Sequence, residues 1–379
     1  MVLFDIDIES SGRSGSCTSS LPEPAEVVEA FSVRTDRSQS PNFDPLLSVR
    51  PNSSLMEASM STRSFLSLLM IMGLSGGLGS AQDTKAEKKD PPKPAAKAPP
   101  MNVVPPTQAD VPYGKHERQV IDFYQAKSDT PTPLVFYIHG GGWQGGSKTG
   151  FNVKPFLEAG ISVAAINYRY VKNGLEEKVE PPVKAPLHDA ARALQFVRSK
   201  AKEWNIDKVR IGATGGSAGG CSSLWLAFHD DLADPKSDDP IAHESTRLYC
   251  AAVNGAQVTL DPIPLREWMP NYSYGAHAFG MKNLDEVNQQ REKIAEWIKE
   301  YSPMSHVTKD DPVIGLFYGG VAGAKKGEEH PDPTHSPMLG LMLMEKLNST
   351  GVEGHITYNG GPTSKYPNAN AFLIERLKK

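Results

Sequence analysis

Residues 209–220 read VRIGATGGSAGG, an apolar strand-like segment that leads into a glycine-rich turn. Ser217 has a glycine two positions before it and another two positions after it, which is the G-x-S-x-G pattern. Glycines at these positions let a strand and a helix approach each other, so that the serine projects from a strained turn. A Lys-Ser or Lys-Thr pair does not follow the glycines, which excludes a P-loop. The stretch predicts a nucleophile elbow centred on Ser217.

A second glycine-rich segment, HGGGW at 139–143, ends the continuous apolar run PLVFYIH at 133–139. Three consecutive glycines leave backbone N–H groups uncovered and approachable. Donors of this kind, together with the amide that follows the nucleophile, hold the oxyanion of a tetrahedral intermediate. We expect two such donors in this segment, and we interpret His139 as structural.

With these two motifs in this order, residues 117–379 resemble the α/β-hydrolase superfamily. The resemblance is strongest to the esterase and lipase branch with an H-G-G-G-W loop, related to hormone-sensitive-lipase-like and acetyl-esterase-like proteins. It implies Ser217 as the nucleophile and oxyanion donors at Gly141, Gly142 and Ala218. It also implies a structural ion pair between Arg169 and Asp189 behind the active site.

The pattern of the whole globular part agrees with this class, because strand-like and helical segments alternate as in βαβ units. We predict an α/β-hydrolase fold: a mainly parallel central sheet, helices on both faces, and a lid-like insertion at 259–309 after the sixth strand. Strands are expected near 119–124, 133–139, 161–168, 209–214, 248–258, 312–318 and 354–358. Helices are expected near 187–204, 284–300, 338–347 and 369–377.

A hydrolase of this fold needs an acid after the seventh strand and a histidine after the eighth. Asp332 precedes the helix that follows the seventh strand and is the candidate acid, whereas Glu328 and Glu329 are interpreted as solvated loop charges. The usual histidine position, near Thr363 or Ser364, has no histidine.

A substitute base could come from the loop before the helix, which contains His330 and His335. His335 is the better candidate because it adjoins the helix start, and it is our tentative catalytic base. A hydrogen bond to Asp332 would, however, pull its ring away from the usual approach. We therefore favour an elbow without a base over a loop histidine that faces Ser217. His355 is interpreted as a packed strand residue, and no role in catalysis is assigned to His188, His229, His243, His277 and His306.

The first third of the chain has a different organisation. Residues 1–59 are polar and Ser-rich, and we interpret them as disordered or as the product of a mis-assigned start, with translation beginning at Met60 or Met56. Residues 60–81 combine a positive start, an apolar run and small residues before the end, as a signal peptide does. Residues 82–112 form a Pro-, Lys- and Ala-rich linker. The hydrolase domain is expected at 113–379, and the protein is expected to be exported, either periplasmic or secreted.

Composition narrows the function further. The 379 residues include 39% hydrophobic and 22% charged residues, which is enough apolar content to form a sizeable core. The formal net charge is −4, so a nucleic-acid partner, which would require an excess of basic residues, is not indicated. Three cysteines exclude a disulfide scaffold, and Cys221 and Cys250 are expected to be buried thiols. Neither a cofactor nor a metal is expected, and no membrane span is expected after signal cleavage.

These observations favour an exported serine esterase that acts on short-chain or carbohydrate-linked acyl esters. The alternative is a catalytically impaired hydrolase-fold protein that binds a ligand, because the usual histidine is missing. An acyltransferase uses the same catalytic groups and stays open. A prolyl-oligopeptidase-type peptidase is a weaker alternative, because no propeller domain precedes the hydrolase segment.

Overall fold

The computed structural model describes residues 104–319 and 325–379. The predicted N-terminal extension, the signal peptide and most of the linker lie outside these residues. The described part contains an eight-stranded sheet in the order β1-β2-β4-β3-β5-β6-β7-β8, antiparallel at β1-β2 and β2-β4 and parallel elsewhere. Its strands are β1 (Gln108–Pro112), β2 (Val120–Tyr124), β3 (Thr132–Ile138), β4 (Ser162–Ile166), β5 (Ile206–Gly216), β6 (Cys250–Asn254), β7 (Val313–Tyr318) and β8 (Gly354–Tyr358).

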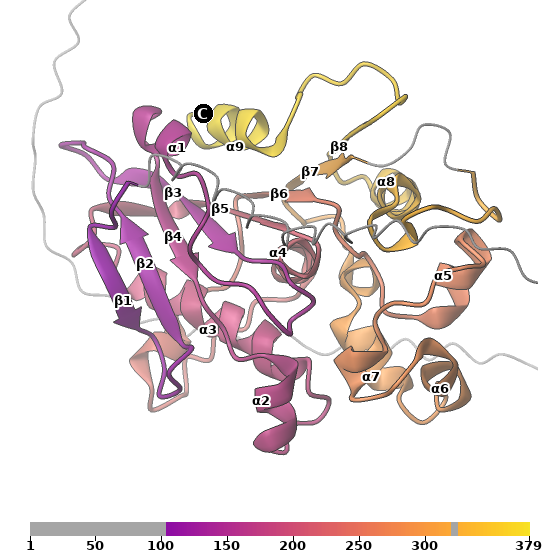
Figure 1. Ribbon diagram of the computed structural model, residues 1–379. Helices are drawn as coiled ribbons and strands as arrows, with labels where there is room; N and C mark the ends of the chain where they lie inside the picture. Colours follow the sequence, from indigo (N-terminus) through magenta and orange to yellow (C-terminus); the bar gives the residue numbers. More distant parts are fainter. Residues whose placement is uncertain (1–103, 320–324) are drawn as a thin grey trace, which may run out of the picture. The chain divides into compact units, whose positions relative to one another are not determined.

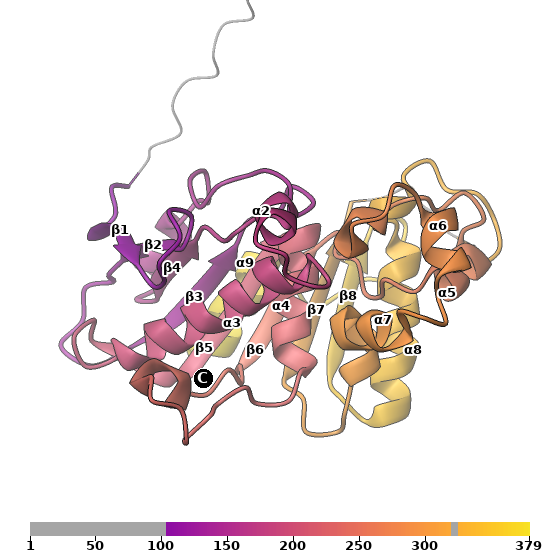
Figure 2. The same ribbon diagram turned by 90° about the horizontal axis from the view of Figure 1, so that it is seen from below.

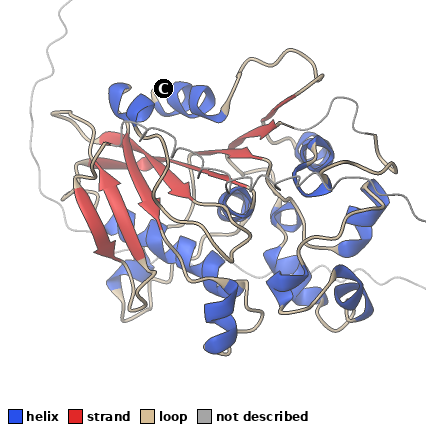
Figure 3. Cartoon of the chain, viewed as in Figure 1, coloured by secondary structure: helices blue, strands red, loops and turns tan. Residues whose placement is uncertain are grey.

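Helices cover both faces of this sheet, as expected (Figures 1 and 3). Successive side chains of a strand point to opposite faces. In β3, accordingly, Phe136 packs into one core and Val135 into the other. The Phe136 side is covered by α3 (Lys184–Ser199), α4 (Ala218–Phe228) and α8 (Pro337–Thr350), and the Val135 side by α1 (Lys154–Glu158) and α9 (Ala369–Leu377). Burial on both faces explains why the central strands read as continuous apolar runs.

The insertion after β6 is a group of short helices that lies next to α8 in both views (Figures 1 and 2). The single helix predicted at 284–300 is wrong: α6 and α7 are separate, and the interruption brings Arg291 against Asp261, with Nη2 and Oδ2 2.7 Å apart. The insertion comprises α5 (Pro262–Trp268), η2 (Ala276–Phe279), α6 (Leu284–Gln289), α7 (Ala295–Tyr301) and η3 (Pro303–His306).

The sheet also begins earlier than the domain boundary predicted at residue 113. Residues 108–112 form β1, which pairs with β2 and packs Val111 on the core. As an edge strand, β1 can accommodate Pro112. The end of the predicted linker is therefore part of the domain. The remaining short elements are α2 (Val171–Glu176), η1 (Pro240–His243) and η4 (Pro333–His335).

Both cysteines of the described part are buried free thiols, as predicted. Burial raises the pKa of Cys250 to about 12 and raises that of Cys221 as well, so both stay protonated and unreactive at neutral pH. Among the described residues, none of the helices combines the length and the apolar character that a membrane crossing requires.

Candidate active site

Ser217 occupies the tight turn between β5 and α4. Its φ of +52° and ψ of −124° are strained for a residue with a side chain, which is the backbone state expected of a nucleophile elbow. The turn is closed by close packing: a Cβ on Gly219 would lie 2.1 Å from the carbonyl oxygen of Ile138. Only glycine permits α4 to start this near the end of β3, and this fixes the serine at the carboxyl edge of the sheet.

An imidazole lies against the Ser217 hydroxyl. His335 Nε2 is 3.0 Å from Ser217 Oγ, and His335 Nδ1 is 2.8 Å from Asp332 Oδ2. An ionised carboxylate only accepts hydrogen bonds, so Nδ1 carries the proton and the lone pair of Nε2 faces the hydroxyl. The three side chains therefore form a hydrogen-bonded series from carboxylate to imidazole to hydroxyl. In this series the imidazole is positioned to accept the proton of the serine.

This contact contradicts the expectation of an elbow without a base. We expected the bond to Asp332 to turn the His335 ring away from Ser217. That bond uses Nδ1, however, and leaves Nε2 on the side of the ring that faces Ser217. The Asp332 carboxylate also accepts from the backbone N–H of His335 at 3.3 Å, which fixes the short turn η4 between them. The pairing that was expected to divert the imidazole orients it toward Ser217.

The other candidates on this loop and beyond lie elsewhere. His330 is buried, with Nδ1 2.7 Å from Ser336 Oγ and Nε2 3.1 Å from the Lys325 carbonyl oxygen. Glu328 is exposed beside Lys325, as expected of a loop charge. His355 lies within β8 and pairs with Glu353, with His355 Nε2 and Glu353 Oε1 2.9 Å apart.

Two side chains outside the sequence motifs hold the loop that carries the acid and the base. Gln257 Nε2 donates to the Thr334 carbonyl oxygen at 2.7 Å. Asn271 makes two bonds to the backbone of His330: its Nδ2 donates at 2.7 Å and its Oδ1 accepts at 3.1 Å. Single polar residues of this kind carry no motif, so sequence reasoning could not select them.

The glycine loop packs directly against the elbow. A Cβ on Gly140 would lie 2.6 Å from the Gly216 carbonyl oxygen, and Gly142 has a φ of +63°. Trp143 is fully buried and its Nε1 donates to Ser222 Oγ on α4 at 3.0 Å, so the indole anchors the loop to the helix that follows Ser217. This packing holds the glycine loop next to the turn that carries Ser217.

Two further residues of the insertion reach this loop. His277 Nε2 donates to the Gly142 carbonyl oxygen at 2.9 Å, and burial lowers the pKa of His277, which keeps the ring neutral. The Tyr274 hydroxyl lies 2.8 Å from where a Cβ on Gly142 would be. This buried hydroxyl has no hydrogen-bond partner among the described residues. Burial also raises its pKa, so it remains a donor.

The predicted structural residues have the roles expected of them. Arg169 Nη2 and Nε lie 2.6 and 3.0 Å from the two carboxylate oxygens of Asp189, and these bonds raise the pKa of the guanidinium. His139 stacks on Tyr168 with ring centres 4.2 Å apart, and burial lowers the pKa of His139 to about 4. It is a neutral, packed residue of the loop.

Comparison with known sequences finds similarity to curated hydrolases. The BD-FAE family matches residues 121–321. The probable carboxylic ester hydrolase LipM of Mycobacterium tuberculosis is 28% identical over 229 residues, covering 55% of this chain and 47% of that protein. A kynurenine formamidase of Danio rerio is 42% identical over 71 residues, 18% of this chain and 24% of that one. The chain thus matches about half or less of the length of these curated relatives.

Solved structures share the fold. The truncated form of a carbohydrate esterase from gut microbiota superposes with a TM-score of 0.53 at 20% identity, covering 72% of this chain and 96% of that one. An acetyl ester-xyloside bifunctional hydrolase from Caldicellulosiruptor lactoaceticus gives a TM-score of 0.50 at 21% identity, covering 68% and 87%. At this level of identity, the likeness shows the α/β-hydrolase fold.

Proposed function

Because the chain belongs to the BD-FAE family, we propose that it is a serine esterase with Ser217, His335 and Asp332 as its catalytic triad. One observation carries the proposal: His335 Nε2 lies 3.0 Å from the Ser217 hydroxyl while its other nitrogen lies 2.8 Å from Asp332. A serine hydroxyl is a weak nucleophile alone, and a base within about 3 Å supplies what the missing histidine of the last loop would have supplied.

In the first half of the reaction, Ser217 Oγ attacks the ester carbonyl carbon while His335 Nε2 takes its proton. The imidazolium that forms is stabilised by Asp332. The carbonyl oxygen becomes an oxyanion, which the amides of Gly141, Gly142 and Ala218 would bind. When the intermediate collapses, the alkoxide leaves and takes the proton from His335, and the acyl group stays on the serine.

In the second half, His335 takes a proton from water as the water attacks the acyl-serine. The second tetrahedral intermediate uses the same oxyanion donors. Its collapse returns the proton to Ser217 Oγ and releases the carboxylic acid. The bonds that break are the ester bond and then the acyl-serine bond, and no oxidant or cofactor takes part.

The surroundings of the glycine loop favour a small substrate group. A cavity of about 250 Å³ beside this loop is lined by Gln144, Val171, Lys172, Leu175, His277, Gly280 and Met281. That volume is at the small end for ligand pockets, which suits a short acyl chain or one sugar unit better than a long fatty chain. The Tyr274 hydroxyl next to Gly142 would donate a hydrogen bond to the bound ester.

The test is hydrolysis of p-nitrophenyl acetate, butyrate and octanoate by the wild type and by the Ser217→Ala variant. The proposal expects turnover that decreases with chain length and disappears with Ser217. A fluorophosphonate probe should label the wild type stoichiometrically at Ser217. Equal esterase rates for the two proteins, or no labelling of the wild type, would leave the ligand-binding alternative in its place.

We also propose that the enzyme works outside the cytoplasm, since residues 60–81 have the composition of a signal peptide. Mass spectrometry of the protein made in cells should find a mature N-terminus near Gln82. A terminus well before that residue would contradict export by this signal.

A further inference from the structure

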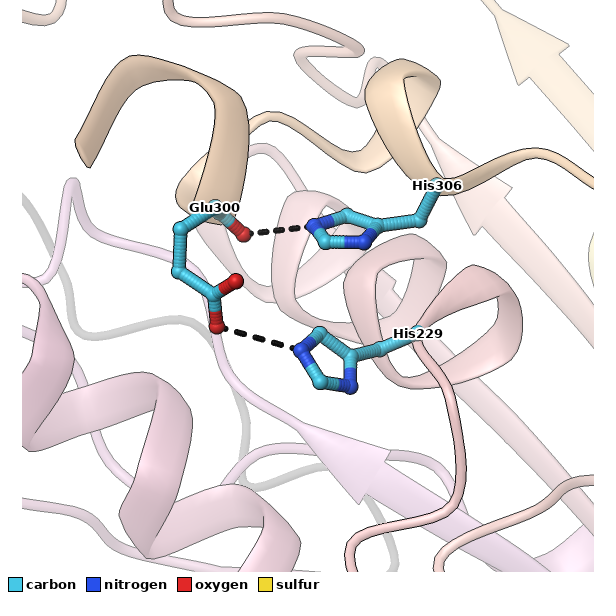
Figure 4. Close-up of side chains that lie close together, drawn as sticks. All are labelled: His229, Glu300 and His306. Atoms are coloured by element: carbon cyan, nitrogen blue, oxygen red, sulfur yellow. Dashed lines mark hydrogen bonds and ion pairs between the residues drawn. The ribbon is translucent and has the colours of Figure 1, made fainter. Parts of the chain in front are cut away.

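At the far end of α4 from Ser217, two imidazoles and a carboxylate meet. They are His229, which follows the last residue of α4, Glu300 in α7 and His306 in η3 (Figure 4). One ligand atom of each side chain lies within 4.8 Å of the other two. The sequence places these residues far apart, so no metal-binding spacing is visible in it, and a metal was not expected.

We propose that His229, Glu300 and His306 bind a divalent transition-metal ion of the zinc type. The first argument is the state of the two rings. His229 Nδ1 is 2.8 Å from the Asp230 carbonyl oxygen, and His306 Nε2 is 2.7 Å from the Glu300 carbonyl oxygen. A carbonyl only accepts, so these nitrogens carry protons, and the opposite nitrogens, Nε2 of His229 and Nδ1 of His306, are the ones that a metal ion would use.

Metal-binding histidines usually hold one nitrogen in this way, on a carbonyl or carboxylate, which fixes the tautomer and aims the other nitrogen. Both rings of the cluster therefore already have the outer hydrogen bond that a ligating histidine needs.

The second argument is the contact between His229 and Glu300. His229 Nε2 lies 3.1 Å from Glu300 Oε1. With a proton already on Nδ1, this contact needs a positive charge between Nε2 and the carboxylate oxygen, which either a second proton on the ring or a bound cation supplies. The separation of the two atoms is close to that of two adjacent ligands, each about 2.1 Å from one zinc ion.

The surroundings suit a cation. The C-terminal end of α4, an 11-residue helix, carries partial negative charge and lies at this site. An adjoining cleft of about 370 Å³ provides an entry path, and its charged lining residues are Glu180, Glu296, Glu300, Lys184 and Lys299. Two imidazoles and one carboxylate form a ligand set that suits zinc. Magnesium and calcium favour sites made of oxygen ligands.

A bound ion would tie the insertion to the helix of the nucleophile. Trp225 Nε1 of α4 already donates to the Glu300 carbonyl oxygen at 2.8 Å, and His229 contacts the Glu300 carboxylate at the same point. The ion would add a further link between α4 and the insertion. Its role is structural, because α4 separates it from Ser217 by about 16 Å at 1.5 Å per residue.

The test is isothermal titration of the full, chelator-stripped chain with ZnCl2, with MgCl2 as the comparison ion. His335→Ala is used as the background, because the Asp332–His335 pair could itself take up zinc. We expect one zinc per chain and no saturable magnesium binding. Adding His229→Ala or His306→Ala should weaken zinc binding at least tenfold, whereas His243→Ala, an exposed histidine bonded to the Ser237 carbonyl oxygen, should change nothing.

Zinc should also raise the thermal midpoint of the His335→Ala protein and leave that of its His306→Ala derivative unchanged. If the alanine variants lose their circular dichroism signal, Glu300→Gln decides, since it keeps shape and removes the charge. Weaker zinc binding by folded Glu300→Gln supports the site. Absence of saturable zinc binding in the His335→Ala background, or binding unaffected by these substitutions, overturns it and leaves only a hydrogen-bonded cluster.

Discussion

The two ends of α4 each hold a histidine beside a carboxylate, and the two pairs differ in what the second ring nitrogen faces. At the N-terminal end, His335 has Asp332 on Nδ1 and the Ser217 hydroxyl on Nε2. At the C-terminal end, His229 has Glu300 on Nε2 and a backbone carbonyl on Nδ1. A hydroxyl can give up a proton to the ring and a carbonyl cannot, so only the first pair can serve as a general base.

Sequence distance separates the pairs as well. Asp332 and His335 are three residues apart, joined through one turn, whereas His229 and Glu300 are 71 residues apart and meet only through packing. The two histidines also differ in exposure: 43% of the His335 side chain is accessible to solvent, whereas 12% of the His229 side chain is accessible. An exposed histidine next to a strained serine suits catalysis, whereas a largely buried histidine between two elements suits a structural role.

The largest expected effect is on kcat, and it comes from substitutions at the N-terminal end of α4. Ser217→Ala and His335→Ala should each lower kcat on p-nitrophenyl acetate by about a thousandfold or more, because either loss removes the activated nucleophile. The double variant should be no slower than either single one. His355→Ala, which alters a histidine of β8, is the control and should keep wild-type rates. A loss of under tenfold in His335→Ala would show that another group serves as the base.

A smaller effect is expected from the acid. Asp332→Asn should lower kcat about a hundredfold, since an amide no longer fixes the tautomer of His335 or stabilises the imidazolium. The same change at Glu329, an exposed carboxylate of the same loop, is the matched control and should leave kcat within a factor of two. Similar losses in both variants would assign the effect to loop charge and not to the pair.

Removing the Tyr274 hydroxyl, which lies beside Gly142, is expected to have an effect of intermediate size. Tyr274→Phe should reduce kcat/KM on p-nitrophenyl acetate about tenfold, the value of one hydrogen bond to the substrate. The fold should be unaffected, because that hydroxyl has no partner among the described residues. Steady-state kinetics with a thermal melt as control measures this. Unchanged kcat/KM would remove Tyr274 from the substrate site.

The C-terminal end of α4 gives the smallest effect, on stability. His188 packs on Trp225, and burial lowers its pKa from 6.5 to about 4. Between these values the unfolded chain binds more protons than the folded one, so stability falls as pH falls. From pH 7 to pH 5 this ring should cost about 2 kcal/mol. His188→Gln should lose correspondingly less stability in urea unfolding over that range, and an equal loss would contradict the assignment.

Much of the fold follows from local sequence. The run at 133–139 and the segment 211–214 are strands because they are buried on both faces, and helix 369–377 has the predicted bounds. The elbow was predictable because glycine spacing and strand-to-helix order are local properties. β1 was missed, since five residues with little apolar content pair only because β2 presents an edge to them.

The sequence by itself determined the candidate nucleophile, the glycine loop and the candidate acid, because each is marked by residue type and place along the chain. Tertiary structure alone decided the candidate base. Asp332 sets the direction of the His335 ring, and the backbone of the loop that carries both residues is held by Gln257 and Asn271, which are remote in sequence. The cluster of His229, Glu300 and His306 has the same origin, because only the packing of the insertion on α4 brings its parts within a ligand's reach.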